Sequence, residues 1–183
     1  MISNKRKTVG TAVVFAALLC AALGGYYYMH YEQGPIYEFN DKRDTKVILD
    51  LFDKNWHWLI ANEGSSPAFY LKHRTPHENP AYFGKLKIKV LRENNEFIGF
   101  AAYYMETPHE GRLLFLGVED KFRGKGYGTI LTQYAMDELI KLGAEEIGLW
   151  TRLSNPAQRI YKKLGFVEAF YTENGFVFYK YYP

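Results

Sequence analysis

Three alternating glycines, Gly124, Gly126 and Gly128, stand between a strand-like and a helix-like segment, and this junction most limits the folds open to the chain. The residues from Arg112 to Val118 predict a strand, and those from Thr129 to Leu142 repeat their apolar positions with the period of a helix. Glycines let backbone amides approach a ligand, and a helix N-terminus directs further amides and partial positive charge to the same place. The junction therefore predicts an α/β domain with a cradle for a pyrophosphate-like group, although a plain tight turn would use the same glycines.

Composition excludes several other classes of protein. The chain has 183 residues, of which 48% are hydrophobic and 23% charged, which is typical of a globular protein. Its single Cys excludes a disulfide framework and any Cys-cluster metal centre, and we expect no metal site. The net charge of +3 comes from Lys5, Arg6 and Lys7, because 20 basic and 20 acidic residues balance from residue 32 onward. We therefore expect no nucleic-acid-binding face.

The beginning of the chain is distinct from the rest. Residues 8–31 carry no formally charged side chain, and Val9 to Met29, 21 residues, would form a helix about 32 Å long, enough to cross a hydrocarbon core of ~30 Å. We expect residues 1–31 to be a basic flank and an uncleaved signal anchor, which attaches the protein to a membrane by a single pass through residues 9–29. A cleaved signal peptide and a lipoprotein signal at Cys20 are the alternatives. The basic flank predicts that the following domain lies outside the cytoplasm.

Residues 36–183 are expected to form one domain with mixed helices and strands. Asp44 is predicted to cap the first helix and Asn155 the last. The alternation of Lys85 to Val90 predicts a strand with one face in water. The remaining elements are strands at 36–39, 97–105, 112–118, 146–151, 166–171 and 176–182, and helices at 69–71 and 129–142.

The segment from Asn155 to Phe166 carries the second motif. Taken alone, Tyr161 is typical of a packed helix aromatic, and Asn155 of a helix cap. Together, in this order and about thirty residues apart, the two segments resemble the GNAT superfamily of acyl-CoA-dependent N-acyltransferases. The segment Arg123–Gly128 matches the acyl-CoA motif [RQ]-x-x-G-x-[GA], and Asn155–Phe166 matches the pattern N-x-x-A-x-x-x-Y-x-x-x-G-F, except that the alanine falls at Ala157.

The resemblance implies a mixed, mostly antiparallel twisted sheet of about six to seven strands flanked by about four helices. It also implies that the fourth strand carries a bulge, for which Gly117 is the candidate, and separates from the fifth. Backbone groups of Leu116 and Val118 would then contact the pantetheine arm, as would Asn155, and Tyr161 would be the general acid. The residues implied to hold the pyrophosphate are Arg123, Gly124, Lys125, Gly126, Tyr127, Gly128 and Thr129.

The function implied by the resemblance is transfer of an acetyl group from acetyl-CoA to a primary amine by direct attack. The acceptor is either a small molecule or a protein amino group. Candidates for the general base are Glu106, Glu110, Glu119, Tyr103 and Tyr104, and none is favoured. The alternative is a non-catalytic module that binds acyl-CoA as a ligand or sensor. Because acetyl-CoA is cytosolic, whereas the charge bias places the domain outside, the side of the membrane on which the domain lies is left open.

Overall fold

The structure is a computed structural model, and it describes residues 36–59 and 66–183. The membrane segment expected at residues 1–31 lies outside the described residues. No helix of the described part is long and apolar enough to cross a membrane. The fold described below is that of the unit Ile36–Pro183.

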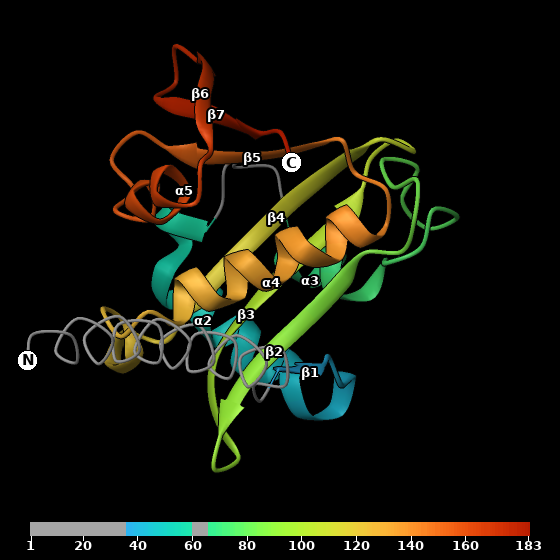
Figure 1. Cartoon of the computed structure of the whole chain (residues 1–183). Helices are drawn as coiled ribbons and strands as arrows, with labels where there is room; N and C mark the ends of the chain where they lie inside the picture. Colours follow the sequence, from blue (N-terminus) through green and yellow to red (C-terminus); the bar gives the residue numbers. More distant parts are fainter. Residues whose placement is uncertain (1–35, 60–65) are drawn as a thin grey trace, which may run out of the picture. The chain divides into compact units, whose positions relative to one another are not determined.

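Seven strands form one sheet in the order β1–β2–β3–β4–β5–β7–β6 (Figure 1). All neighbouring strands run antiparallel except β4 and β5, which run parallel. This confirms the mixed, mostly antiparallel sheet that the resemblance implied. The strands are β1 (Ile36–Glu38), β2 (Lys87–Glu93), β3 (Glu96–Met105), β4 (Glu110–Val118), β5 (Glu146–Arg152), β6 (Val167–Tyr171) and β7 (Phe176–Tyr181).

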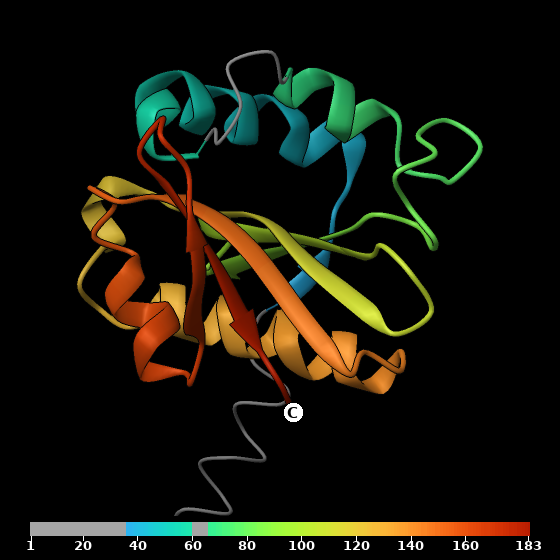
Figure 2. The ribbon, with the colours of Figure 1, turned by 90° about the horizontal axis from the view of Figure 1, so that it is seen from above.

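Helices cover both faces of the sheet, so the described chain has three layers. Figure 2 shows α2 and α3 on one face and α4 and α5 on the other. Each face has its own apolar core: Ile48, Leu51 and Phe52 of α2 are buried on one side, and Leu131 and Leu139 of α4 on the other. The helices are α2 (Asp41–Leu59), α3 (Pro67–Lys72), α4 (Tyr127–Lys141) and α5 (Gln158–Lys163), with a 3-10 helix η1 (Asp120–Phe122).

The strand face that we expected to lie in water is covered only in part, because Lys85 is exposed and Lys87 is half-buried. Lys89 of β2 is only 8% exposed. Its ammonium group lies 5.5 Å from the centre of the Tyr134 ring of α4 and is paired with Glu38 of β1. The prediction of a wet face was wrong at Lys89, because α4, distant in sequence, packs against this part of the sheet.

Candidate active site

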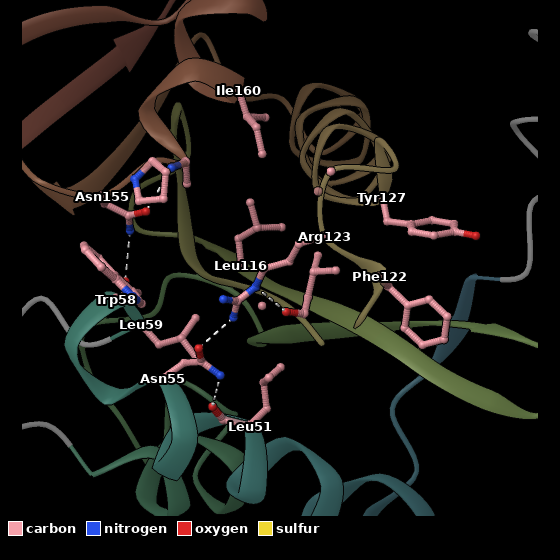
Figure 3. Close-up of a pocket in the computed structure, with 16 residues that line it drawn as sticks. Leu51, Asn55, Trp58, Leu59, Leu116, Phe122, Arg123, Tyr127, Asn155 and Ile160 are labelled. Carbon is pink, nitrogen blue, oxygen red and sulfur yellow. Dashed lines mark hydrogen bonds between the residues drawn. The ribbon is translucent and has the colours of Figure 1, made fainter. Parts of the chain in front are cut away.

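Strands β4 and β5 pair over only three residues and then diverge. The paired residues are Glu110–Arg112 of β4 and Glu146–Gly148 of β5. Beyond them, a cleft of about 250 Å³ opens beside the end of β4 (Figure 3). The cleft is therefore a break in the sheet, walled by the end of α2, the loop that leads into α4, and the start of α5. Its lining residues are Leu51, Asn55, Trp58, Leu59, Leu116, Gly117, Val118, Phe122, Arg123, Gly124, Tyr127, Gly128, Asn155, Pro156, Ala157 and Ile160.

The end of β4 turns backbone groups toward this cleft. Just beyond the strand, the amide of Glu119 donates to Ile98 O on β3 at 2.9 Å. Because alternate residues of a strand direct their amide and carbonyl groups to opposite edges, those of Leu116 and Val118 point away from β3. They face the side on which β5 has separated from β4, which is the side of the cleft.

The bulge in β4 lies at Leu114 and not at Gly117, so that prediction was wrong. Opposite β3, Ala102 pairs with Phe115 and Tyr103 with Leu113, which leaves Leu114 as the extra residue. Gly117 has a packing role. A Cβ there would lie 2.7 Å from Phe100 Cε1 and 2.9 Å from Leu51 Cδ2.

The glycine loop, residues 123–128, leads directly into α4. Gly124 and Gly126 have φ angles of +75° and +90°, which L-residues rarely adopt. Gly128 serves close packing, because a Cβ there would lie 2.8 Å from Ile160 Cδ1 of α5. Helix α4 starts at Tyr127, two residues earlier than predicted. Its first-turn amides are thus presented at the mouth of the cleft, an arrangement suited to an anion.

Arg123 joins this loop to two other elements. Its Nε donates to Val118 O at 3.0 Å, and its Nη2 donates to Asn55 Oδ1 of α2 at 2.7 Å (Figure 3). Nη2 also lies 2.8 Å from Asp120 Oδ1. The Arg123 guanidinium group therefore connects α2 to the end of β4.

Asn155 makes the corresponding link on the far side of the cleft. Its Oδ1 accepts from the Ala157 amide at 2.9 Å, and its Nδ2 donates to Trp58 O at the end of α2, at 3.1 Å. Helix α5 begins at Gln158. Asn155 thus caps the turn before the helix rather than the helix itself, and its amide group is used to position α2.

Tyr161 of α5 borders a second, smaller cavity of about 20 Å³. Its ring packs 6.0 Å from the ring centres of both Phe166 and Tyr179. Burial raises the pKa of the Tyr161 hydroxyl above its ordinary value of 10, with a smaller contribution from Tyr179. The phenol is therefore fully protonated at neutral pH. The residues around this cavity are Trp58, Leu59, Leu113, Leu114, Phe115, Leu116, Trp150, Thr151, Asn155 and Tyr161.

Comparison with known proteins decides what kind of domain surrounds this cleft. The family described as "Acetyltransferase (GNAT) family" matches residues 45–166, which is more than half of the chain. The chain belongs to the GNAT acetyltransferase family. The match includes both motifs and the α2 wall.

Individual relatives of this GNAT chain are similar over part of their length. N-alpha-acetyltransferase 30 of Schizosaccharomyces pombe is 36% identical over 83 residues, which is 42% of this chain and 55% of that protein. The [ribosomal protein bS18]-alanine N-acetyltransferase of Haemophilus influenzae is 32% identical over 98 residues, 54% of this chain and 62% of that protein. The chain therefore spans less than two thirds of these relatives.

A solved structure is similar in fold. The crystal structure of ribosomal-protein-alanine N-acetyltransferase from Brucella melitensis has a TM-score of 0.65 and 16% sequence identity, covering 81% of this chain and 99% of that one. At this identity the likeness concerns the fold alone.

Most of the site residues predicted from the sequence line the cleft of this GNAT chain. Lys125, Gly126 and Thr129 are not among its lining residues. Lys125 lies beside the cleft, with its ammonium group 5.3 Å from the centre of the Phe122 ring. Tyr161 lines the smaller cavity. The predicted residues that line the larger cleft are Leu116, Val118, Arg123, Gly124, Tyr127, Gly128 and Asn155.

The α2 wall was missed by the sequence analysis. Asn55 lies four residues from both Leu51 and Leu59 and is therefore a polar residue on an apolar helix stripe, which was the available signal. It is buried, and its φ of −128° and ψ of 26° interrupt α2. The interruption brings Trp58 and Leu59 to the cleft, where they form part of the wall.

Two of the candidate bases are held in ion pairs. Arg112 Nη2 lies 2.5 Å from a carboxylate oxygen of Glu106 and 3.4 Å from one of Glu110. Burial raises the pKa of Tyr104 to about 12, and burial also raises the pKa of Tyr103. The raised pKa values keep both phenols protonated at neutral pH, so neither tyrosine is assigned as the base. Among the described residues there is no group of three or more side chains that could hold a metal ion.

Proposed function

We propose that this chain is an acetyl-CoA-dependent N-acetyltransferase that moves an acetyl group to a primary amine. The observation that carries the proposal is the position of the glycine loop and the α4 N-terminus at a break between β4 and β5, in a chain of the GNAT family. Amides, a helix N-terminus and a nearby buried phenol together suit a pyrophosphate-bearing thioester.

In this proposal the cosubstrate lies along the cleft. The amides of the glycine loop and of the first turn of α4 bind the pyrophosphate. The backbone groups of Leu116 and Val118 bind the pantetheine arm as an added strand would, with Asn155 beside them. Arg123 Nε donates a hydrogen bond to Val118 O. The arginine must therefore share or release that carbonyl when pantetheine binds.

The chemistry proposed for the cleft is direct attack. A neutral amine attacks the thioester carbonyl carbon, and backbone amides stabilise the oxyanion that forms. The carbon–sulfur bond then breaks, its electron pair stays on sulfur, and Tyr161 gives its proton to that thiolate. The attacking nitrogen loses its extra proton to solvent, and the Tyr161 phenolate takes a proton back from solvent. Since burial raises the pKa of the Tyr161 hydroxyl, the proton is present at neutral pH.

We propose a protein α-amino group as the acceptor, with a small primary amine as the alternative. The support is that both curated relatives are named for acetylation of protein amines. The aromatic rings of Trp58 and Trp150, which border the smaller cavity, are compatible with a side chain next to the reacting amine.

The test uses the purified full chain in mild detergent with acetyl-CoA and peptides that carry a free α-amine, and measures release of free thiol. Tyr161→Phe should lower kcat by at least about 100-fold and should change the acetyl-CoA Kd by less than about threefold. The control is Tyr182→Phe, because Tyr182 is exposed and lines neither cavity. Binding of acetyl-CoA without thiol release from any peptide or small amine would favour the sensor module instead.

We also propose that residues 9–29 attach the protein to a membrane by a single pass. The support is their length, their lack of charge and the basic residues Lys5 to Lys7 before them. Alkaline carbonate washing should leave the full chain in the membrane fraction and release a variant without residues 1–31. A reporter fused after Pro183 then reports the side on which the domain lies, and release of the full chain by carbonate would refute the attachment.

A further inference from the structure

Thr151, which lines the second cavity, has a buried hydroxyl without a hydrogen-bond partner among the described residues. Thr151 of β5 is only 4% exposed, and its Oγ1 contacts no partner in the part of the chain that the structure describes. Tyr82 and Tyr103 also bury an unpaired hydroxyl, but they line neither cavity. An unsatisfied buried polar group lowers stability, and a folded protein keeps one where it has a use.

Thr151 and Tyr161 line the same small cavity. Thr151 pairs with Val177 of β7, and residues directly opposite in an antiparallel pair point to the same face. Val177 belongs to the apolar core that also contains Tyr161, so both hydroxyl-bearing side chains approach from that face. Both line the cavity of about 20 Å³, which is room for about one water-sized group.

We propose that the Thr151 hydroxyl donates a hydrogen bond to the sulfur of the bound thioester. This inference rests on the proposed function, and it adds a residue that neither sequence motif contains. As the carbon–sulfur bond breaks, its electron pair goes to sulfur. Tyr161 Oη gives its proton to that sulfur, while Thr151 keeps its own proton and stabilises the growing negative charge.

The hydrogen bond from Thr151 to sulfur should affect kcat more than it affects the binding of acetyl-CoA. A neutral sulfur is a weak acceptor, whereas a thiolate accepts strongly, so the hydrogen bond is stronger in the transition state than in the bound substrate. Thr151→Val should therefore lower kcat about tenfold and change the acetyl-CoA Kd by less than about threefold. Thr151→Ser keeps the hydroxyl and should recover most of the lost kcat.

Stability separates this role from a structural one. Valine has nearly the shape of threonine, and the Thr151 hydroxyl has no partner to lose, so Thr151→Val should leave Tm unchanged or raise it. Thr132 is the matched control, because its buried hydroxyl donates to Gly128 O at 2.7 Å. Thr132→Val should lower Tm. A fall in Tm for Thr151→Val as large as that for Thr132→Val would overturn the proposal, as would an unchanged kcat.

A binding measurement tests the contact without turnover. At pH 9 the thiol of free CoA, with a pKa of about 8.5, is mostly thiolate. The full chain should then bind CoA about fivefold more tightly than desulfo-CoA, which lacks the sulfur, and Thr151→Val should remove most of that preference. An unchanged preference in Thr151→Val refutes the Thr151 contact even if the wild-type enzyme is active. If the wild type shows no acetyl transfer, the proposed function fails, and this preference still decides the contact.

Discussion

The hydrogen bond between Asn55 and Arg123 should be the main tie between α2 and the glycine loop, and Asn55→Ala is the perturbation that tests it. Asn55 is buried where α2 is interrupted. Its Nδ2 donates to Leu51 O at 3.1 Å, and its Oδ1 accepts from Arg123 Nη2 at 2.7 Å. Alanine removes both bonds and leaves the carbonyl of Leu51 and part of a guanidinium group without these partners.

The expected loss follows from the two bonds. The bond to Leu51 O is neutral and buried, which is worth about 1 kcal/mol. The bond to Arg123 involves a charge, but the Arg123 side chain is 45% exposed, so solvent reduces its contribution to about 1 kcal/mol. Asn55→Ala should therefore lower the free energy of unfolding by about 2 kcal/mol, or Tm by about 4–8 °C.

A double-mutant cycle isolates the part that belongs to the pair. Asn55→Ala, Arg123→Ala and the double variant are compared by thermal and urea unfolding, and a coupling of about 1 kcal/mol is expected. The control cycle uses Lys46 and Asp50, an exposed pair on the same helix at 2.7 Å, for which about 0.3–0.5 kcal/mol is expected. A coupling for Asn55 and Arg123 no larger than that of the control pair would refute the reasoning.

Three further predictions test other parts of the site. Gly117→Ala should cost about 1–3 kcal/mol of stability, because its Cβ would lie 2.7 Å from Phe100 Cε1, whereas Gly84→Ala, which meets nothing within 4 Å, should be neutral in the same thermal melts. Equal Tm values for these two variants would contradict the packing argument. Asn155→Asp keeps the acceptor for the Ala157 amide but loses the donor to Trp58 O, so calorimetry should show acetyl-CoA binding about fivefold weaker; an unchanged Kd would mean that this bond does not position the cleft. Because burial raises the pKa of Tyr161 above 10, its proton is retained below that pH, and kcat/KM should rise with amine deprotonation and show no falling limb below pH 10. A falling limb between pH 7 and 9 that Tyr161→Phe leaves unchanged would mean that another group supplies the proton.

The elements that local signals define were predictable from sequence. The turn Thr172–Gly175 between two apolar strands gave the β6–β7 hairpin, because turn residues and alternation act over a few positions. The glycines of residues 123–128 placed the start of α4 to within two residues. Four of the cleft residues found in advance lie on this glycine segment: Arg123, Gly124, Tyr127 and Gly128.

Features set by distant partners were not predictable. Asp44 was expected to cap α2, yet Asn40 Oδ1 accepts from the Arg43 amide at 3.1 Å and takes that role. The Asp44 carboxylate is buried against Arg92, at 2.6 Å, which lies 48 residues further along the chain. Hydrogen bonds to Arg43, to the Asn40 amide and to Arg92 lower the pKa of Asp44 despite its burial. The sequence shows that Asp44 carries a charge, but it does not show that Arg92 is its partner.

The bulge position was missed for the same reason. Gly117 was a reasonable guess from residue type, since glycine is common at bulges. The extra residue at Leu114 is fixed by how β4 pairs with Ala102 and Tyr103 of β3. That register depends on two strands together, and no pattern within β4 alone reports it.

The three-residue ladder between β4 and β5 makes the sheet behave as two ribbons, β1–β4 and β5–β7–β6. Short ladders open at low free energy, so native-state hydrogen exchange should resolve the ribbons as two separate opening units. A cosubstrate that contacts both sides of the gap would hold the two ribbons together. The stabilisation from binding, RT ln(1 + [L]/Kd), would then be added to the free energy of opening of both ribbons, so slower hydrogen exchange in β5–β7 would report that the glycine loop is occupied.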